Sequence, residues 1–173
     1  MKTKKLTVTA ILLGLALIIF VIEAQLPPLA PIPGIKLGLA NIITLIAIYV
    51  LGRKEAFLIL LLRIILGSIF TGGFAGFLYS MSGGIVCFAV MASASLKLGE
   101  NSMWVVSVFG AIGHNIGQIA VACFVIGSAQ VVWYLPVLMI SAVLTGTFTG
   151  IAAQFTTRQL RKTKYLKEKD NNA

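Results

Sequence analysis

The sequence predicts an all-α, polytopic membrane protein with six transmembrane helices, and two observations lead to this fold class. The 173 residues are 58% hydrophobic and 11% charged, so a water-soluble domain would lack the polar groups to cover its surface. The apolar residues also gather in long runs, and a bilayer-spanning helix needs about 20 of them. We therefore expect one membrane domain over residues 1–157 and a basic cytoplasmic tail over residues 158–173.

Breaks at glycine, proline and charged residues divide the chain into six candidate spans. The first, residues 6–25, has the basic start of a signal peptide, but its apolar run is longer and no small-residue cleavage site closes it. The second and third, residues 36–51 and 55–70, are short for membrane spans. The last three spans are expected over residues 74–98, 103–127 and 131–154.

The distribution of lysine and arginine predicts the orientation of these spans. Twelve of the fourteen basic residues lie in the N-terminal segment, the connectors "GRKE" and "KLGEN", and the C-terminal tail. The connectors "LPPLAPIPGI", "TGG" and "GSAQ" contain none. Because basic residues collect on the cytoplasmic side, we expect a cell-membrane protein with both termini in the cytoplasm. The tail fits a solvated helix end better than an RNA-binding arm, so no nucleic-acid partner is expected.

Arg63 lies in the middle of an apolar run, "LILLLRIILG". A charged side chain at the centre of a membrane helix costs about 2.5–3.5 kcal/mol on insertion scales, so each one is a functional candidate. Arg63 is too deep to reach either membrane face and should point into the bundle. Two interpretations remain open, an internal pair with Glu23 or direct contact with a ligand.

A proline-rich loop, "PPLAPIPG", separates the first two spans and brings Glu23 and Lys36 to the same outer end. A lysine beside the positive end of a helix dipole is unfavourable unless an anion lies there, held by free backbone amides and the ammonium group. The alternative is that Lys36 reaches lipid phosphates. In the first interpretation the loop is a rigid lid, because proline lowers the entropy cost of ordering it.

Polar residues spaced by three or four positions form a stripe on the fifth span. Glycines beside this stripe, at positions 110, 113 and 117, would let another helix approach closely. The stripe suits hydrogen bonds to a ring or head group, although a network between helices would explain it equally. No second histidine, cysteine or aspartate stands at ligand spacing, so a metal site is not expected. The stripe consists of Ser107, Ala111, His114 and Gln118, with Asn115 beside it.

Other polar residues in the spans give weaker signals. Asn41 and Thr44 share one face of the second span, and Tyr79 lies in the glycine-rich fourth span, where plain packing is the stronger interpretation. The chain has five acidic residues and no D-D-x-x-D, Walker or nucleophile-elbow motif. We therefore expect no catalytic residue and no bound cofactor in this chain.

Four blocks, "EAQLPPLAPIPGIKLGLAN", "LLRIILGS", "YSMSGG" and "GAIGHNIGQ", together resemble a bacterial membrane family with two labels. It is described as the Gx transporter family or as heptaprenyl diphosphate synthase component I, and the resemblance covers residues 6–154. The size and six-helix layout are similar to the S components of energy-coupling factor transporters. Those subunits capture vitamins and dock on a transmembrane partner that carries two ATPases.

The resemblance also implies particular roles. In S components a small-x-x-x-small motif near the start of the first helix contacts the partner, and Ala10 and Gly14 fit that motif, with glycine where alanine is usual. Family members accompany flavin-linked extracellular electron transfer systems, which implies a flavin or quinone as a ligand.

Two functional hypotheses follow from these observations. In the first, the chain is an S-component-like binding subunit for uptake of a small metabolite, possibly a flavin or other vitamin-like compound, energised by a separate ATPase partner. In the second, it is a component I subunit that supports polyprenyl diphosphate or quinone biosynthesis, or flavin-linked electron transfer. A purely structural role would leave the intramembrane polar residues less explained. The expected binding residues are Glu23, Lys36, Asn41, Arg63, Tyr79, His114, Asn115 and Gln118.

Overall fold

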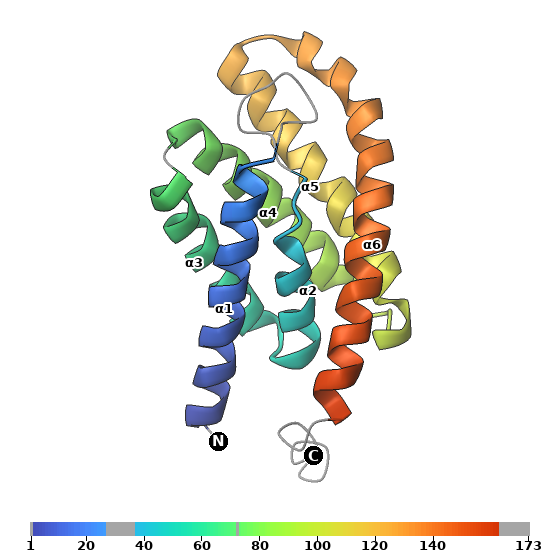
Figure 1. The fold of residues 1–173 in the computed structure, drawn as a ribbon. Coiled ribbons are helices and arrows are strands. Elements are labelled where there is room, and N and C mark those ends of the chain that lie inside the picture. The colour runs from blue at the N-terminus through green and yellow to red at the C-terminus, as the bar shows by residue number, and fades with distance from the viewer. Residues whose placement is uncertain (1, 27–36, 72, 163–173) are drawn as a thin grey trace.

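The computed structural model describes residues 2–26, 37–71 and 73–162. Every element of regular secondary structure in this part of the chain is a helix (Figure 1). The all-α prediction is therefore confirmed. Two short 3-10 helices, η1 (Glu100–Ser102) and η2 (Ala129–Tyr134), precede the last two long helices. The α-helices of these described ranges are α1 (Lys2–Ala24), α2 (Asn41–Val50), α3 (Arg53–Thr71), α4 (Phe74–Ala94), α5 (Met103–Ile126) and α6 (Leu135–Lys162).

Four of these helices, α1, α4, α5 and α6, are long and apolar enough to cross a membrane. The structure thus supports a multi-pass membrane protein with four clear spans, where the sequence predicted six. The ten residues of α2 rise only about 15 Å, half of the bilayer's hydrocarbon thickness of about 30 Å. The nineteen residues of α3 are long enough, but four of them are charged.

The short α2 occupies the interior of the bundle. It packs against each of the other five α-helices, and eight of its ten residues are buried. Apart from Asn41 and Thr44, its sequence "NIITLIAIYV" is apolar on all sides, which is the pattern of a helix without a solvent or lipid face. Figure 1 shows α2 beginning lower in the bundle than the end of α1, so the chain enters the interior before this helix starts.

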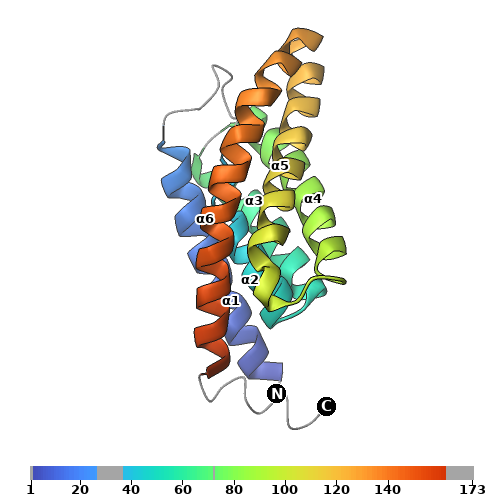
Figure 2. The same ribbon diagram turned by 90° about the vertical axis from the view of Figure 1, so that its right-hand side faces the viewer.

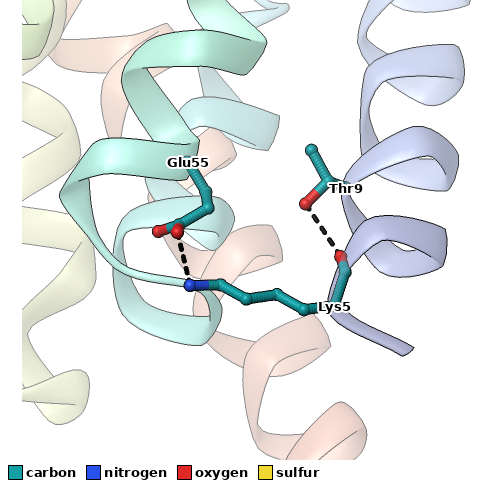
Figure 3. Close-up of polar contacts among 3 residues, drawn as sticks. All are labelled: Lys5, Thr9 and Glu55. Carbon is teal, nitrogen blue, oxygen red and sulfur yellow. Dashed lines mark hydrogen bonds and ion pairs between the residues drawn. The ribbon is translucent and has the colours of Figure 1, made fainter. Parts of the chain in front are cut away.

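The start of α1 and the end of α6 lie at the same end of the molecule (Figures 1 and 2). Lys5 of α1 pairs there with Glu55 of α3, while Thr9 Oγ1 donates to the Lys5 carbonyl oxygen at 2.9 Å (Figure 3). At this end α6 is tied to η1 by an ion pair between Arg161 and Glu100. The connectors that the charge distribution grouped with the termini therefore do lie together, and the cytoplasmic orientation stays a prediction.

Two differences in element boundaries stand out near the C-terminus. The last span was expected over residues 131–154, but α6 begins at Leu135 and continues to Lys162, so the first residues of the expected tail are helical. The preceding residues form η2, which is closed at its start by the Ser128 hydroxyl accepting the Gln130 N–H at 3.3 Å.

Glycines set the distances between α4, α5 and α6. A Cβ added at Gly150 of α6 would lie 2.5 Å from the Trp104 Cα of α5, and one at Gly117 of α5 would lie 2.8 Å from the Ser82 carbonyl oxygen of α4. The Ser82 hydroxyl also donates to the Gly117 carbonyl oxygen at 2.7 Å. The predicted close approach at the glycine face of the fifth span is confirmed.

We predict that Gly150→Ala lowers the free energy of unfolding by about 1–3 kcal/mol, because the new methyl group meets backbone atoms that no rotamer change can move. Thermal unfolding of the purified protein in detergent measures the effect. Gly76→Ala in α4 is the control, since a Cβ there meets nothing within 4 Å. Equal midpoints for the two variants would contradict the close α5–α6 contact.

Candidate functional site

Four buried polar side chains from four helices meet around the start of α2. They are Glu23 at the end of α1, Asn41 at the start of α2, Arg63 in the middle of α3, and His114 in α5, with exposed fractions between 3% and 8%. We call these four side chains the α2 polar cluster. Burying such groups in an apolar bundle is unfavourable unless they are paired, so their partners define the site.

Glu23 caps the buried N-terminus of α2. Its carboxylate accepts the backbone N–H of Gly38 through Oε1 and that of Ala40 through Oε2, the second at 3.3 Å. The Ala40 cap residue itself offers no side-chain hydrogen bond to the helix. The carboxylate therefore satisfies amides that would otherwise be buried without partners, and its charge complements the positive end of the helix dipole.

This contact corrects one prediction. We expected backbone amides near this helix start to be free to hold an anion together with Lys36. The amides of Gly38 and Ala40 are instead occupied by the protein's own carboxylate. Lys36 and the proline-rich loop lie outside the described residues, so their predicted roles stay predictions.

Asn41 links Arg63 to His114. Arg63 Nη2 donates to Asn41 Oδ1 at 3.1 Å, which leaves the Asn41 amide nitrogen 3.3 Å from His114 Nδ1. Because the side-chain nitrogen of asparagine is only a donor, Nδ1 of His114 must be the acceptor, and the neutral imidazole carries its proton on Nε2. The direction of both hydrogen bonds follows from Arg63, because a guanidinium can only donate and so fixes the orientation of the Asn41 amide.

Arg63 keeps part of its hydrogen-bonding capacity unused. Its Nε atom is buried and has no partner among the described residues. Its guanidinium carbon lies 5.9 Å from the centre of the Phe20 ring, which is within cation–π range. Within the described part of the chain, the Arg63 guanidinium thus contacts one amide oxygen and one aromatic face.

Two glycines hold the His114 ring in place. A Cβ at Gly38 would lie 3.0 Å from His114 Cδ2, and one at Gly83 of α4 would lie 2.8 Å from His114 Nδ1. Gly38 also has a φ of +78°, which side-chain-bearing residues rarely adopt. The close approach of both backbones fixes the ring, and Gln118 lies beside it, fully buried next to Gly83.

The remaining predicted site residues lie in other surroundings. Asn115 donates through Nδ2 to the Leu138 carbonyl oxygen of α6 at 2.6 Å, as in a network between helices. Tyr79 is 2% exposed and packs in an apolar cluster that includes Ile119 and Val131. The structure thus brings together Glu23, Asn41, Arg63 and His114, with Gln118 adjacent, while Asn115 and Tyr79 contact the α6 side.

A small cavity adjoins the α2 polar cluster. Its volume is about 10 Å³, and its lining includes Asn41, Ser107 of α5 and Thr149 of α6. That volume holds about one water molecule. Ser107 Oγ and Thr149 Oγ1 are 3.0 Å apart, so part of the polar stripe of α5 is used to join α5 to α6. Among the described residues, this cavity is too small for a metabolite unless the helices around it separate.

Sequence reasoning missed the capping role of Glu23 and the contacts of Phe20 and Gly38. No spacing rule connects Glu23 with an amide fifteen residues away. Gly38, three residues before the first residue of α2, was a usable signal for an unusual backbone conformation, but not for its neighbour in space.

A family model described as heptaprenyl diphosphate synthase component I matches residues 12–156. The match runs from α1 into α6 and includes the whole α2 polar cluster. No curated protein and no solved structure matches the chain.

We predict that Asn41→Ala and Arg63→Met are coupled by about 0.5–3 kcal/mol in a double-mutant cycle, because each single change leaves a buried partner without its hydrogen bond. Unfolding free energies of the single and double variants in detergent give the coupling. The control cycle combines Arg63→Met with Asn115→Ala, whose amide bonds to α6 instead. Equal coupling in the two cycles would contradict a specific Asn41–Arg63 contact.

Proposed function

We propose that this chain, which belongs to the heptaprenyl diphosphate synthase component I family, is a substrate-binding membrane subunit for uptake of a small metabolite. The metabolite would be anionic or ring-bearing, with a flavin or another vitamin-like compound as the leading candidate. A separate partner with ATPase activity would supply the energy, since this sequence carries no nucleotide-binding motif.

The observation that carries this proposal is the burial of Arg63. Its side chain is 3% exposed in the middle of α3 and its Nε atom has no partner among the described residues. A buried ionic group is weak evidence for stability, since apolar replacements are often as stable. The presence of Arg63 at a buried position therefore favours a role in ligand binding over a role in stability.

The shape of α2 supports the same proposal. Non-helical backbone at membrane depth is tolerated where it is enclosed by protein or lines a cavity, and transporters often bind substrates at the ends of such broken helices. Residues 37–40 enter the bundle without helix, and α2 starts beside Arg63 and His114. Binding would require α2 to move away from α5, because the present cavity is too small for a metabolite.

The surface of α1 fits the proposed docking role. Ala10 is exposed, and the space beside Gly14 is open, since a Cβ there would meet nothing within 4 Å. A small-x-x-x-small surface of this kind lets a partner helix approach closely. We propose that an energy-coupling transmembrane subunit contacts this face.

The family description supports one alternative function. In that alternative the chain is a membrane subunit of polyprenyl diphosphate or quinone biosynthesis, or of flavin-linked electron transfer. A diphosphate would then take the place near Arg63, and the apolar tail of the lipid would lie among the exposed hydrophobic side chains of the long helices.

We predict that gentle purification followed by mass spectrometry detects a small molecule released from the wild-type protein and at least about tenfold less from Arg63→Ala, since a charge-assisted hydrogen bond contributes about 1.5–3 kcal/mol. Arg158→Ala is the matched control, because that arginine is exposed and contacts Asn101 at the terminal end. A water-soluble ring compound would favour uptake, and a prenyl diphosphate or quinone would favour the alternative. Equal amounts from Arg63→Ala and wild type would contradict a binding role for Arg63.

We also predict that Ala10→Leu weakens docking to the coupling partner and leaves ligand retention unchanged, because the larger side chain keeps a partner helix at a distance. Co-purification of the partner and the released-ligand measurement report the two effects separately. Ala120→Leu, at another exposed alanine on α5, is the control. Ligand loss without loss of docking would contradict this division of roles.

A further inference from the structure

We propose that the carboxylate of Glu23 fills an anion subsite at the start of α2 and that a carboxylate or phosphate group of the ligand replaces it there. The inference rests on the proposed function for the identity of the incoming ligand, whereas the subsite itself is built from residues of this chain. In the present structure the Glu23 carboxylate would then occupy the position of the ligand's acidic group.

The geometry of the subsite is that of a bound anion. Both oxygens of the carboxylate are used, one on the N–H of Gly38 and the other on the N–H of Ala40. Amides at a helix N-terminus bind free carboxylates and phosphates in the same way, because the helix dipole adds to the hydrogen bonds. The positive φ of Gly38 is part of this arrangement, and a Cβ at that position would meet Asn41 and His114.

Arg63 is the independent observation that points to a ligand. Its guanidinium contacts Asn41, the first residue of α2, while its Nε is buried and has no partner among the described residues. A group that brought additional acceptor oxygens to the same place could use the free Nε, which the present arrangement leaves unsatisfied.

Charge balance explains why an anion would exchange with Glu23. Glu23 and Arg63 are the two charged side chains of the α2 polar cluster, and the structure gives no ion pair between them. Withdrawal of the carboxylate would leave two buried amides without an acceptor and the cluster with an unbalanced positive charge. Leaving a buried charge without its partner is strongly destabilising, so Glu23 can leave only if another negative group arrives. A neutral molecule would not satisfy this requirement, which makes the subsite selective for ligands with an acidic group.

The same competition sets how the wild-type protein responds to simple anions. Glu23 is tethered to the site and acts at a high effective concentration, so a small free anion cannot displace it. A natural ligand would need further contacts, for which the buried Nε of Arg63 is an available donor. Removal of the Glu23 carboxylate should therefore expose an anion site that the wild-type protein hides.

Chemical rescue of Glu23→Ala tests this inference in the full-length protein. The thermal unfolding midpoint in detergent is followed against sodium acetate, with sodium chloride at the same ionic strength as the reference. We expect the midpoint of Glu23→Ala to rise with acetate until it saturates, and that of the wild type to stay unchanged. Glu55→Ala is the matched control, because it removes a carboxylate that pairs with Lys5 at the terminal end. Equal effects of acetate and chloride on Glu23→Ala would overturn the inference.

Glu23→Gln keeps the test decisive if Glu23→Ala does not fold. The glutamine can still accept one N–H, but it lacks the charge that balances Arg63. We expect inorganic phosphate to raise its unfolding midpoint more than that of Glu55→Gln, and equal shifts would overturn the inference. If acetate or phosphate stabilises the Glu23 variants but the wild-type protein releases no metabolite, the subsite is supported and the uptake proposal fails. If the wild-type protein releases a metabolite but neither anion stabilises the variants, only the subsite inference fails.

Discussion

Glu23 holds the start of α2 inside an apolar bundle, and the arrangement of the neighbouring helices follows from that contact. A helix that begins in the interior has amides that water cannot reach, so it needs an acceptor supplied by the protein. The carboxylate at the end of α1 supplies it, which places α1 against the start of α2. The remaining length of α2 is then enclosed by the other helices.

Arg63 in α3 is the other buried charge near the start of α2, and its guanidinium donates to Asn41 and not to the Glu23 carboxylate. From Arg63 the hydrogen bonds pass in one direction, through Asn41 to His114 in α5. Two sets of polar contacts therefore meet at the start of α2. Glu23 joins α1 to the backbone before α2, and the hydrogen bonds from Arg63 through Asn41 to His114 join α2 to α3 and α5. This gives the interior of the described bundle a polar centre whose hydrogen bonds are made within the protein.

The same physical argument found the main residues of the site from the sequence. Arg63 and His114 stood out because a polar group is unfavourable in hydrocarbon, and the structure buries both in one cluster. Tyr79 and Asn115 also met that criterion, yet they pack toward α6, where hydrogen bonding and packing satisfy them. Unfavourable burial identifies a polar residue as notable, but it does not distinguish a residue that binds a ligand from one that joins two helices.

The sequence by itself determined the all-α membrane class, the grouping of the basic connectors with the termini, and the glycine face of α5, because hydropathy, charge placement and small residues act through local or one-dimensional patterns. Only the tertiary structure decided that α2 is a short interior helix and that Glu23 closes its amides. Whether an apolar run crosses the membrane or ends inside the protein depends on which partners its backbone ends find, and those partners come from residues far away in the chain.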